Sequence, residues 1–241
     1  MKVSRDARLT QAFVLEGADL QALVQHLRTW AATFRFEALC ADSLTRHFES
    51  VEEVLDFENP ARREMEVLHI RAYSEDHCTT FSLKLDRDTR SNVYFTVEGE
   101  ETIASQTNQF VEERLSSMKP WYSLLARTNF IFVLSIIVSA LSSGVLIATA
   151  FLSPTTATGQ STTARSVVQA LLIGVGFGFA PLLLGYLLNR FCSKFFPMGA
   201  FALGQGIKRH RDKEFLRSTV IVGFAVSFVA SIIAAIFFIK A

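Results

Sequence analysis

The first half of the chain shows two hydrophobic periods, one of two residues and one of three to four, which predict strands and helices respectively. Apolar residues at 20–27 recur at helical spacing behind Asp19, an expected N-cap, and Ser50 is expected to cap a short further helix. Hairpin-length spacings between the strand-like runs favour antiparallel pairing. We therefore expect one cytoplasmic α+β domain over 1–118, with an antiparallel sheet of about five strands and two main helices. The expected strands lie at 8–15, 34–40, 66–73, 79–86 and 92–99, and the two main helices begin near 19 and 100.

The second half contains three long runs without a charged residue, at 130–152, 167–189 and 219–239. A bilayer core about 30 Å thick needs about 20 apolar helical residues, so each run is long enough to span it. The pattern therefore predicts that an all-α membrane domain of three transmembrane helices follows the α+β domain. The remaining segments are expected to be a juxtamembrane connector at 119–129, an outside loop at 153–166 and a basic cytoplasmic loop at 190–218.

A shorter apolar stretch, at 195–207, lies inside the basic loop. It is too short to cross a bilayer, which leaves an interfacial segment or a re-entrant turn. Gly199, Gly204 and Gly206 lower its helical propensity and favour the interfacial alternative.

Charge divides the chain near residue 120. Residues 1–120 carry 14 Lys and Arg against 21 Asp and Glu, whereas residues 121–241 carry 10 against 2. Loops rich in Lys and Arg stay in the cytoplasm, so the N-terminus is expected inside and the C-terminus outside a plasma or bacterial inner membrane. The acidic first half argues against a nucleic-acid partner, because phosphate backbones bind basic surfaces. The residues expected at the membrane interface are Trp121, Tyr122, Arg127, Lys208, Arg209, Arg211, Lys213 and Arg217.

Small residues recur along each apolar run, mostly at steps of four. Small side chains let helix backbones approach closely in lipid, so these stripes are expected to pack the three helices together. The alternative is that one stripe meets another subunit or lines a pore. The residues concerned are Ser135, Ser139 and Ser143, then Gly174, Gly178 and Gly185, and finally Gly223, Ser227 and Ser231.

Catalytic chemistry is hard to find in this sequence. It has no nucleophile elbow, no Gly-rich phosphate loop and no HExxH motif, so the chain is not expected to be an enzyme. The three cysteines have no metal-ligand spacing, and neither a metal nor a cofactor is expected. Arg62 and Arg63 are adjacent in a loop and are the weak candidates for binding a phosphate or carboxylate.

These expectations combine into a homo-oligomeric integral membrane protein whose cytoplasmic domain binds a ligand or partner and controls the transmembrane bundle. A channel or pore-forming effector is one form of this hypothesis. The alternative is a membrane-tethered scaffold that recruits a cytoplasmic protein without transport. Expected partners are the lipid bilayer, other copies of the chain, and a cytoplasmic protein or small anionic ligand. The architecture alone resembles small bacterial membrane effectors of some phage-defence systems, and this resemblance assigns no residues.

Overall fold

The alternating pattern of the first half folds as a six-stranded antiparallel sheet in the computed structural model, which describes residues 2–88, 92–140 and 182–240. Alternate side chains of the four inner strands are largely buried, as a sheet covered on one face requires, whereas the two edge strands have no buried residue. The expected number was about five strands. In sheet order, the strands are β1 (Lys2–Leu9), β7 (Val93–Glu100), β6 (Thr80–Asp86), β5 (Met65–Tyr73), β3 (Thr33–Cys40) and β4 (Thr45–Phe48).

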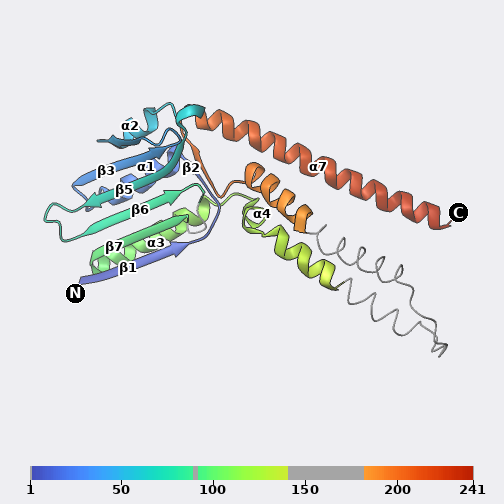
Figure 1. Ribbon diagram of the computed structural model, residues 1–241. Coiled ribbons are helices and arrows are strands. Elements are labelled where there is room, and N and C mark those ends of the chain that lie inside the picture. Colours follow the sequence, from blue (N-terminus) through green and yellow to red (C-terminus); the bar gives the residue numbers. More distant parts are fainter. Residues whose placement is uncertain (1, 89–91, 141–181, 241) are drawn as a thin grey trace, which may run out of the picture. The chain divides into compact units, whose positions relative to one another are not determined.

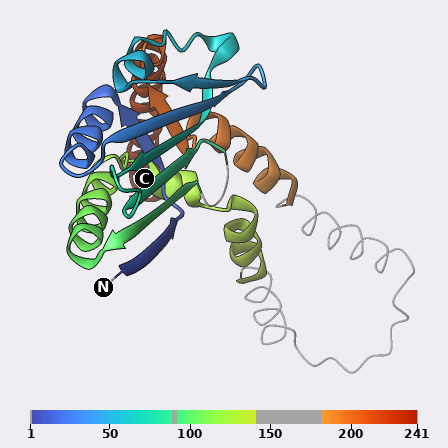
Figure 2. The same cartoon turned by 90° about the vertical axis from the view of Figure 1, so that its left-hand side faces the viewer.

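Two helices, α1 (Gly17–Leu27) and α3 (Glu101–Ser117), lie against the same face of this sheet (Figures 1 and 2). The core between them and the sheet is continuous and apolar. Burying one such Leu or Ile side chain stabilises the fold by about 1.5–3 kcal/mol. The most buried contributors are Leu20, Leu23 and Leu27 of α1, Leu68 and Ile70 of β5, Phe95 of β7, and Val111 and Leu115 of α3.

Short elements complete the region. Ser50 caps α2 (Val51–Asp56), because its hydroxyl accepts a hydrogen bond from the Glu53 amide at 3.2 Å. A 3₁₀ turn, η1 (Ala61–Arg63), precedes β5. The expected strand at 8–15 is two strands, because β1 ends at Leu9 and β2 (Phe13–Glu16) starts a separate pairing.

The partner of β2 comes from the far end of the chain. Strand β8 (Gly199–Ala202) pairs with β2 in parallel, and Phe13 meets Phe201 edge-on with ring centroids 5.7 Å apart. Phe201 and Leu203 belong to the core of the α+β region. The apolar stretch at 195–207, expected at a membrane interface, thus supplies a strand that is buried in protein.

The chain divides into two compact units, Met1–Ser123 with Pro197–Ala241, and Leu124–Phe196. The first unit contains the sheets and the helix α7 (Gln205–Lys240) of 36 residues. The second contains most of α4 (Ser123–Arg127) and helical residues 130–140 and 182–195. Within the second unit, Asn189 donates its side-chain amide to the Asn129 side chain at 3.1 Å, and a Cβ at Gly185 would lie 2.8 Å from the Ile131 Cα.

In the ranges that the structure describes, no helix has both the length and the apolar character that crossing a membrane requires. This finding contradicts the expected all-α membrane domain of three transmembrane helices. It also contradicts the integral-membrane localisation, with its inside and outside termini, and the assignment as an ion channel or pore. The expected outside loop at 153–166, and large parts of the runs at 130–152 and 167–189, lie outside the described residues.

The described helices include charged residues that the sequence assigns to a loop, so their bounds are not those of the uncharged runs. The expected basic loop at 190–218 is largely helical, because one helix ends at residue 195 and α7 begins at Gln205. The charged stretch and the run at 219–239 therefore share one helix. Arg190 and Lys194 likewise lie in the helix at 182–195.

Candidate functional site

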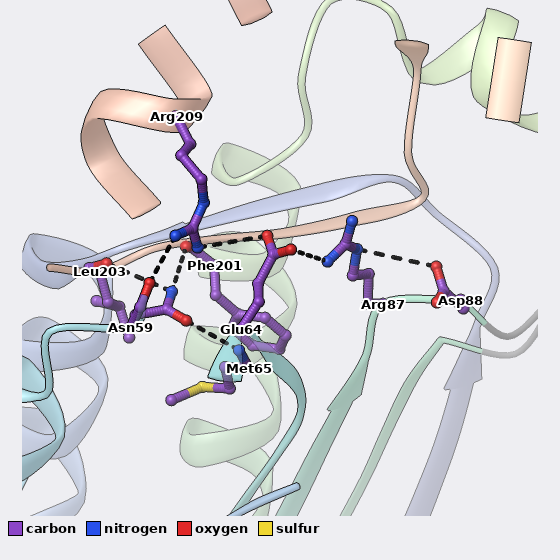
Figure 3. A network of polar contacts seen from close by, with 8 residues as sticks. All are labelled: Asn59, Glu64, Met65, Arg87, Asp88, Phe201, Leu203 and Arg209. Atoms are coloured by element: carbon purple, nitrogen blue, oxygen red, sulfur yellow. Dashed lines mark hydrogen bonds and ion pairs between the residues drawn. The ribbon is translucent and has the colours of Figure 1, made fainter. Parts of the chain in front are cut away.

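Asn59 ties β8 to the α+β region. It is fully buried and holds a left-handed backbone angle, φ +46°, which Asn adopts more readily than most residues. Its side-chain amide donates to the carbonyl oxygens of Phe201 at 3.2 Å and Leu203 at 3.4 Å, and its side-chain oxygen accepts from the Met65 amide at 2.9 Å (Figure 3). One side chain therefore joins the start of β5 to the segment that leads into α7.

Glu64 and Arg209 form a second connection beside this one (Figure 3). Arg209 of α7 donates to the Asn59 carbonyl oxygen at 2.7 Å, and its Nη2 lies 3.5 Å from Glu64 Oε1. The other oxygen of Glu64 lies 2.6 Å from Nη1 of Arg87, the residue after β6. Glu64 is thus a carboxylate bridge between two guanidinium groups, one on α7 and one at the end of the sheet. The side chains of all three residues are about three-quarters buried.

Two hollows flank the first turns of α7. The larger one, which we call the α7 groove, has a volume of about 820 Å³ and is lined by β2, the start of α1, the segment after α3, and α7. The smaller one, which we call the basic cavity, has a volume of about 20 Å³. His210 lines both hollows. The groove residues with polar side chains are Glu16, Trp121, His210, Arg211, Glu214 and Ser218.

Glu214 organises one wall of the α7 groove. One of its carboxylate oxygens accepts a hydrogen bond from the Trp121 indole at 2.7 Å, and the other lies 3.2 Å from His210 Nε2. The same oxygen lies 3.8 Å from Arg217, whose guanidinium carbon lies 4.5 Å from the Tyr122 ring centroid. Both members of the aromatic pair that the sequence predicts at a membrane interface therefore contact α7, and Tyr122 is only 1% exposed.

His210 has a pKa below the ordinary value of 6.5, because its partial burial disfavours the charged ring. Glu214 and Glu16 oppose this shift, whereas Arg217 and Lys213 reinforce it. Since the unfolded chain then binds more protons than the folded chain near pH 6, stability rises with pH through that range.

We expect the free energy of unfolding to fall as the pH is lowered from about 8 to about 5.5. The fall is expected to be smaller in His210→Gln, which cannot take up the proton. The comparison with His210→Gln is necessary because burial also lowers the pKa of His26 and His69, which therefore contribute to the same pH dependence in both proteins. Denaturant titrations at several pH values measure the slope, and NMR titration of the His210 ring measures its pKa. Equal slopes in both proteins, or a His210 pKa above 6.5, would contradict this assignment.

Arg62 and Arg63, the ligand candidates chosen from the sequence, lie exposed on η1 and line neither hollow. Arg209, Lys213 and Arg217, expected as membrane anchors, line the basic cavity. Sequence reasoning missed Asn59, Glu64, Arg87, His210 and Glu214. The Asn59–Pro60 dipeptide, a turn signal, was the one local hint.

The remaining predicted residues are scattered. Ser135 and Ser139 line a shallow hollow in the second unit. Ser227 and Ser231 are exposed on α7, where the Ser231 hydroxyl donates to the Ser227 carbonyl at 2.8 Å. Arg127, Lys208 and Arg211 are exposed, and a side chain at Gly223 would meet open space. Ser143, Gly174 and Gly178 lie outside the described residues.

No family model matches the chain, and comparisons with curated proteins and with solved structures likewise gave no match. Among the described residues, no group of His, Cys, Asp and Glu side chains could hold a metal ion. What the geometry offers is a pair of hollows beside a helix that is attached to an α+β region by a few buried polar contacts.

Proposed function

We propose that the α+β region, with β8 and the first turns of α7, is a binding domain whose occupation by a ligand or partner controls the docking of α7. One observation carries this proposal. The α7 groove has walls from both the α+β elements and α7, so an occupant would touch both at once. Its volume of about 820 Å³ lies within the range of about 300–1,000 Å³ that is common for small-molecule sites.

The contacts that hold α7 against the α+β region are few enough for a bound ligand to shift its docking. Its first turns are held by Asn59 and by the bridge from Arg209 through Glu64 to Arg87. Each such hydrogen bond contributes about 1 kcal/mol net, so their sum is comparable with what a ligand can supply. An occupant that prefers one arrangement of α7 tenfold shifts the equilibrium by about 1.4 kcal/mol. The expected homo-oligomer stays a prediction.

A large side chain introduced into the α7 groove can imitate an occupant of the groove. Ala18 lines the groove on α1, and Ala18→Trp would place a large ring inside it. Spin labels on Cys78, which is exposed, and on a cysteine introduced by Val220→Cys report the distance between the sheet and α7. Cys192→Ser removes the other accessible thiol, and Cys40 is buried. We expect Ala18→Trp to shift the distance distribution measured by pulsed electron resonance.

The matched control is Ala32→Trp, the same change at an exposed alanine that does not line the groove. It is expected to leave the distribution unchanged. If Ala18→Trp also leaves the distribution unchanged while circular dichroism shows a folded protein, occupation of the groove does not control α7 and the proposal fails.

A scaffold that recruits a protein partner is the second candidate, and the sheet face opposite α1 and α3 favours it. This face presents polar side chains in register across the strands, such as His47, Glu37, His69, Lys84 and Tyr94. Glu37 lies 3.9 Å from His69 and 3.8 Å from Arg71, so the face is charged and only half-buried. A partner bound there would be lost on Lys84→Glu with no change in the distance between the spin labels.

A further inference from the structure

The basic cavity brings together positive side chains that are far apart in the sequence. Arg87 comes from the end of β6, and Arg209, Lys213 and Arg217 come from successive turns of one face of α7. Glu64 is the carboxylate that lines the same cavity. Glu214, on the groove side of α7, lies 3.8 Å from Arg217 and offsets part of its charge. Asp88 lies 3.9 Å from Arg87 and offsets part of its charge as well. Four cations therefore face three carboxylates.

The guanidinium of Arg209 is incompletely matched. Nη1 donates to the Asn59 carbonyl, and Nη2 lies 3.5 Å from Glu64, beyond a good hydrogen bond. Its Nε is buried and has no hydrogen-bond partner among the residues that the structure describes. A buried donor of a charged group without an acceptor is costly, so an acceptor at this position would stabilise the arrangement.

The pKa of Lys213 is also affected by the neighbouring positive charges. The residue is exposed overall, yet the pKa of its amine lies below the ordinary value. Partial desolvation is the main cause, and Arg87, Arg217 and Arg209 lower it further against the opposing effect of Glu64. Mutual repulsion of this kind is relieved by a bound anion.

We propose that the basic cavity binds the phosphate group of a small ligand and that the bound phosphate fastens α7 to the end of the sheet. This inference rests on the proposed function, since it names a ligand class for the same binding domain. A phosphate supplies negative charge to these cations and has more acceptor oxygens than a carboxylate or chloride. Guanidinium forks suit its tetrahedral oxygens.

The size of the cavity restricts how the group binds. A volume of about 20 Å³ is close to that of one water-sized probe, so the cavity receives an oxygen edge of the phosphate and not a whole organic molecule. The rest of the group would meet Lys213, whose exposed side chain has the freedom to close over it. Free phosphate and a phosphomonoester present the same edge.

Calorimetric titration of the full chain, at constant ionic strength and a pH of about 8, where phosphate is a dianion, tests the inference. The probes are inorganic phosphate, adenosine 5′-monophosphate and acetate. We expect saturable binding of the first two and none of acetate. Tighter binding of the nucleotide would indicate a ligand with a further group outside the cavity, and equal binding would indicate free phosphate.

Lys213→Gln is expected to weaken phosphate binding about tenfold or more, because it removes one charge-assisted contact without touching the Asn59 and Glu64 connections. Lys208→Gln removes an equal charge from an exposed position of α7 outside the cavity, and the double variant Arg62→Gln/Arg63→Gln removes the candidates chosen from the sequence. Both are expected to leave the affinity within about twofold. Absence of saturable phosphate binding, or equal losses in Lys213→Gln and Lys208→Gln, would overturn the inference.

The spin-label distance separates this inference from the proposed function. Phosphate that binds through Lys213 in a protein whose distance distribution does not respond to Ala18→Trp would support the anion site and refute the control of α7. A distance that responds to Ala18→Trp in a protein that binds no phosphate would refute the anion site and leave the binding domain standing.

Discussion

Asn59→Ala is expected to lower the free energy of unfolding by about 3 kcal/mol, because it leaves several buried backbone groups without their partner. The Met65 amide and the Phe201 and Leu203 carbonyls all bond to the Asn59 side chain. A loss of this size is a large part of the about 5–15 kcal/mol that stabilises a typical domain. The loss should be accompanied by undocking of β8 and the first turns of α7. Urea denaturation followed by tryptophan fluorescence measures it.

Two variants make the interpretation specific. Asn59→Gly keeps the left-handed backbone accessible and removes only the amide, so it should lose nearly as much as Asn59→Ala. Asn108→Ala removes another buried amide, on a residue that is 5% exposed, which bonds within its own helix to Glu112, and it should cost less than about 1 kcal/mol. Equal losses at Asn59 and Asn108 would show that Asn59 has no special role at the junction.

Gly204→Ala is expected to destabilise the protein by about 3 kcal/mol or more. Gly204 has φ +50°, a conformation that costs a residue with a side chain about 1–2 kcal/mol. An added Cβ would also lie 2.5 Å from the Phe57 carbonyl oxygen and 2.6 Å from that of Glu58, and these backbone atoms cannot rotate away. Overpacking of this kind costs about 1–3 kcal/mol.

Gly223→Ala provides the matched control, since it is the same substitution at a helical position of α7 where an added Cβ meets nothing within 4 Å. It should be neutral or stabilise by up to about 1 kcal/mol, through helix propensity. Thermal and urea denaturation of both variants test the difference. A Gly204→Ala protein as stable as the parent would mean that the turn between β8 and α7 does not approach the α+β region as closely as described.

The elements of the α+β region could be predicted well where the pattern was local. Leu20, Leu23, Val24 and Leu27 are all buried on α1, and Ser50 caps α2 through the Glu53 amide. Strands β5, β6 and β7 also follow the alternation closely. Each of these signals depends on residues within one turn or one strand, where sequence spacing and spatial contact coincide.

The pairing of β2 with β8 could not be predicted in the same way. Phe13 and Gly199 are partners in a parallel ladder although almost the whole chain separates them. The apolar run around Phe201 is equally compatible with burial in protein and in lipid, because both solvents select the same residue types. In the sequence Gly204 and Gly206 predict weak helix formation, whereas in the structure they allow close approach of the backbone to Phe57 and Phe201.

The candidate site was missed for a related reason. Arg209 meets Glu64 and Asn59 only after β8 has brought the start of α7 to the α+β region. Adjacent Arg62 and Arg63 looked more like an anion site than isolated arginines do, yet adjacent residues on a short turn point into solvent. The positive side chains of the basic cavity are brought together by the fold, and most of them are not neighbours in the sequence.

The distance between spin labels at Cys78 and at position 220 is the measurement that tests the central claim most directly. Asn59→Ala supplies the reference distribution for an undocked α7, and the parent chain supplies the docked one. The proposal predicts that Ala18→Trp moves the distribution away from that of the parent chain while Ala32→Trp does not. An Ala18→Trp distribution that coincides with that of the parent chain, while the Asn59→Ala distribution differs from it, would contradict the claim that this junction controls α7.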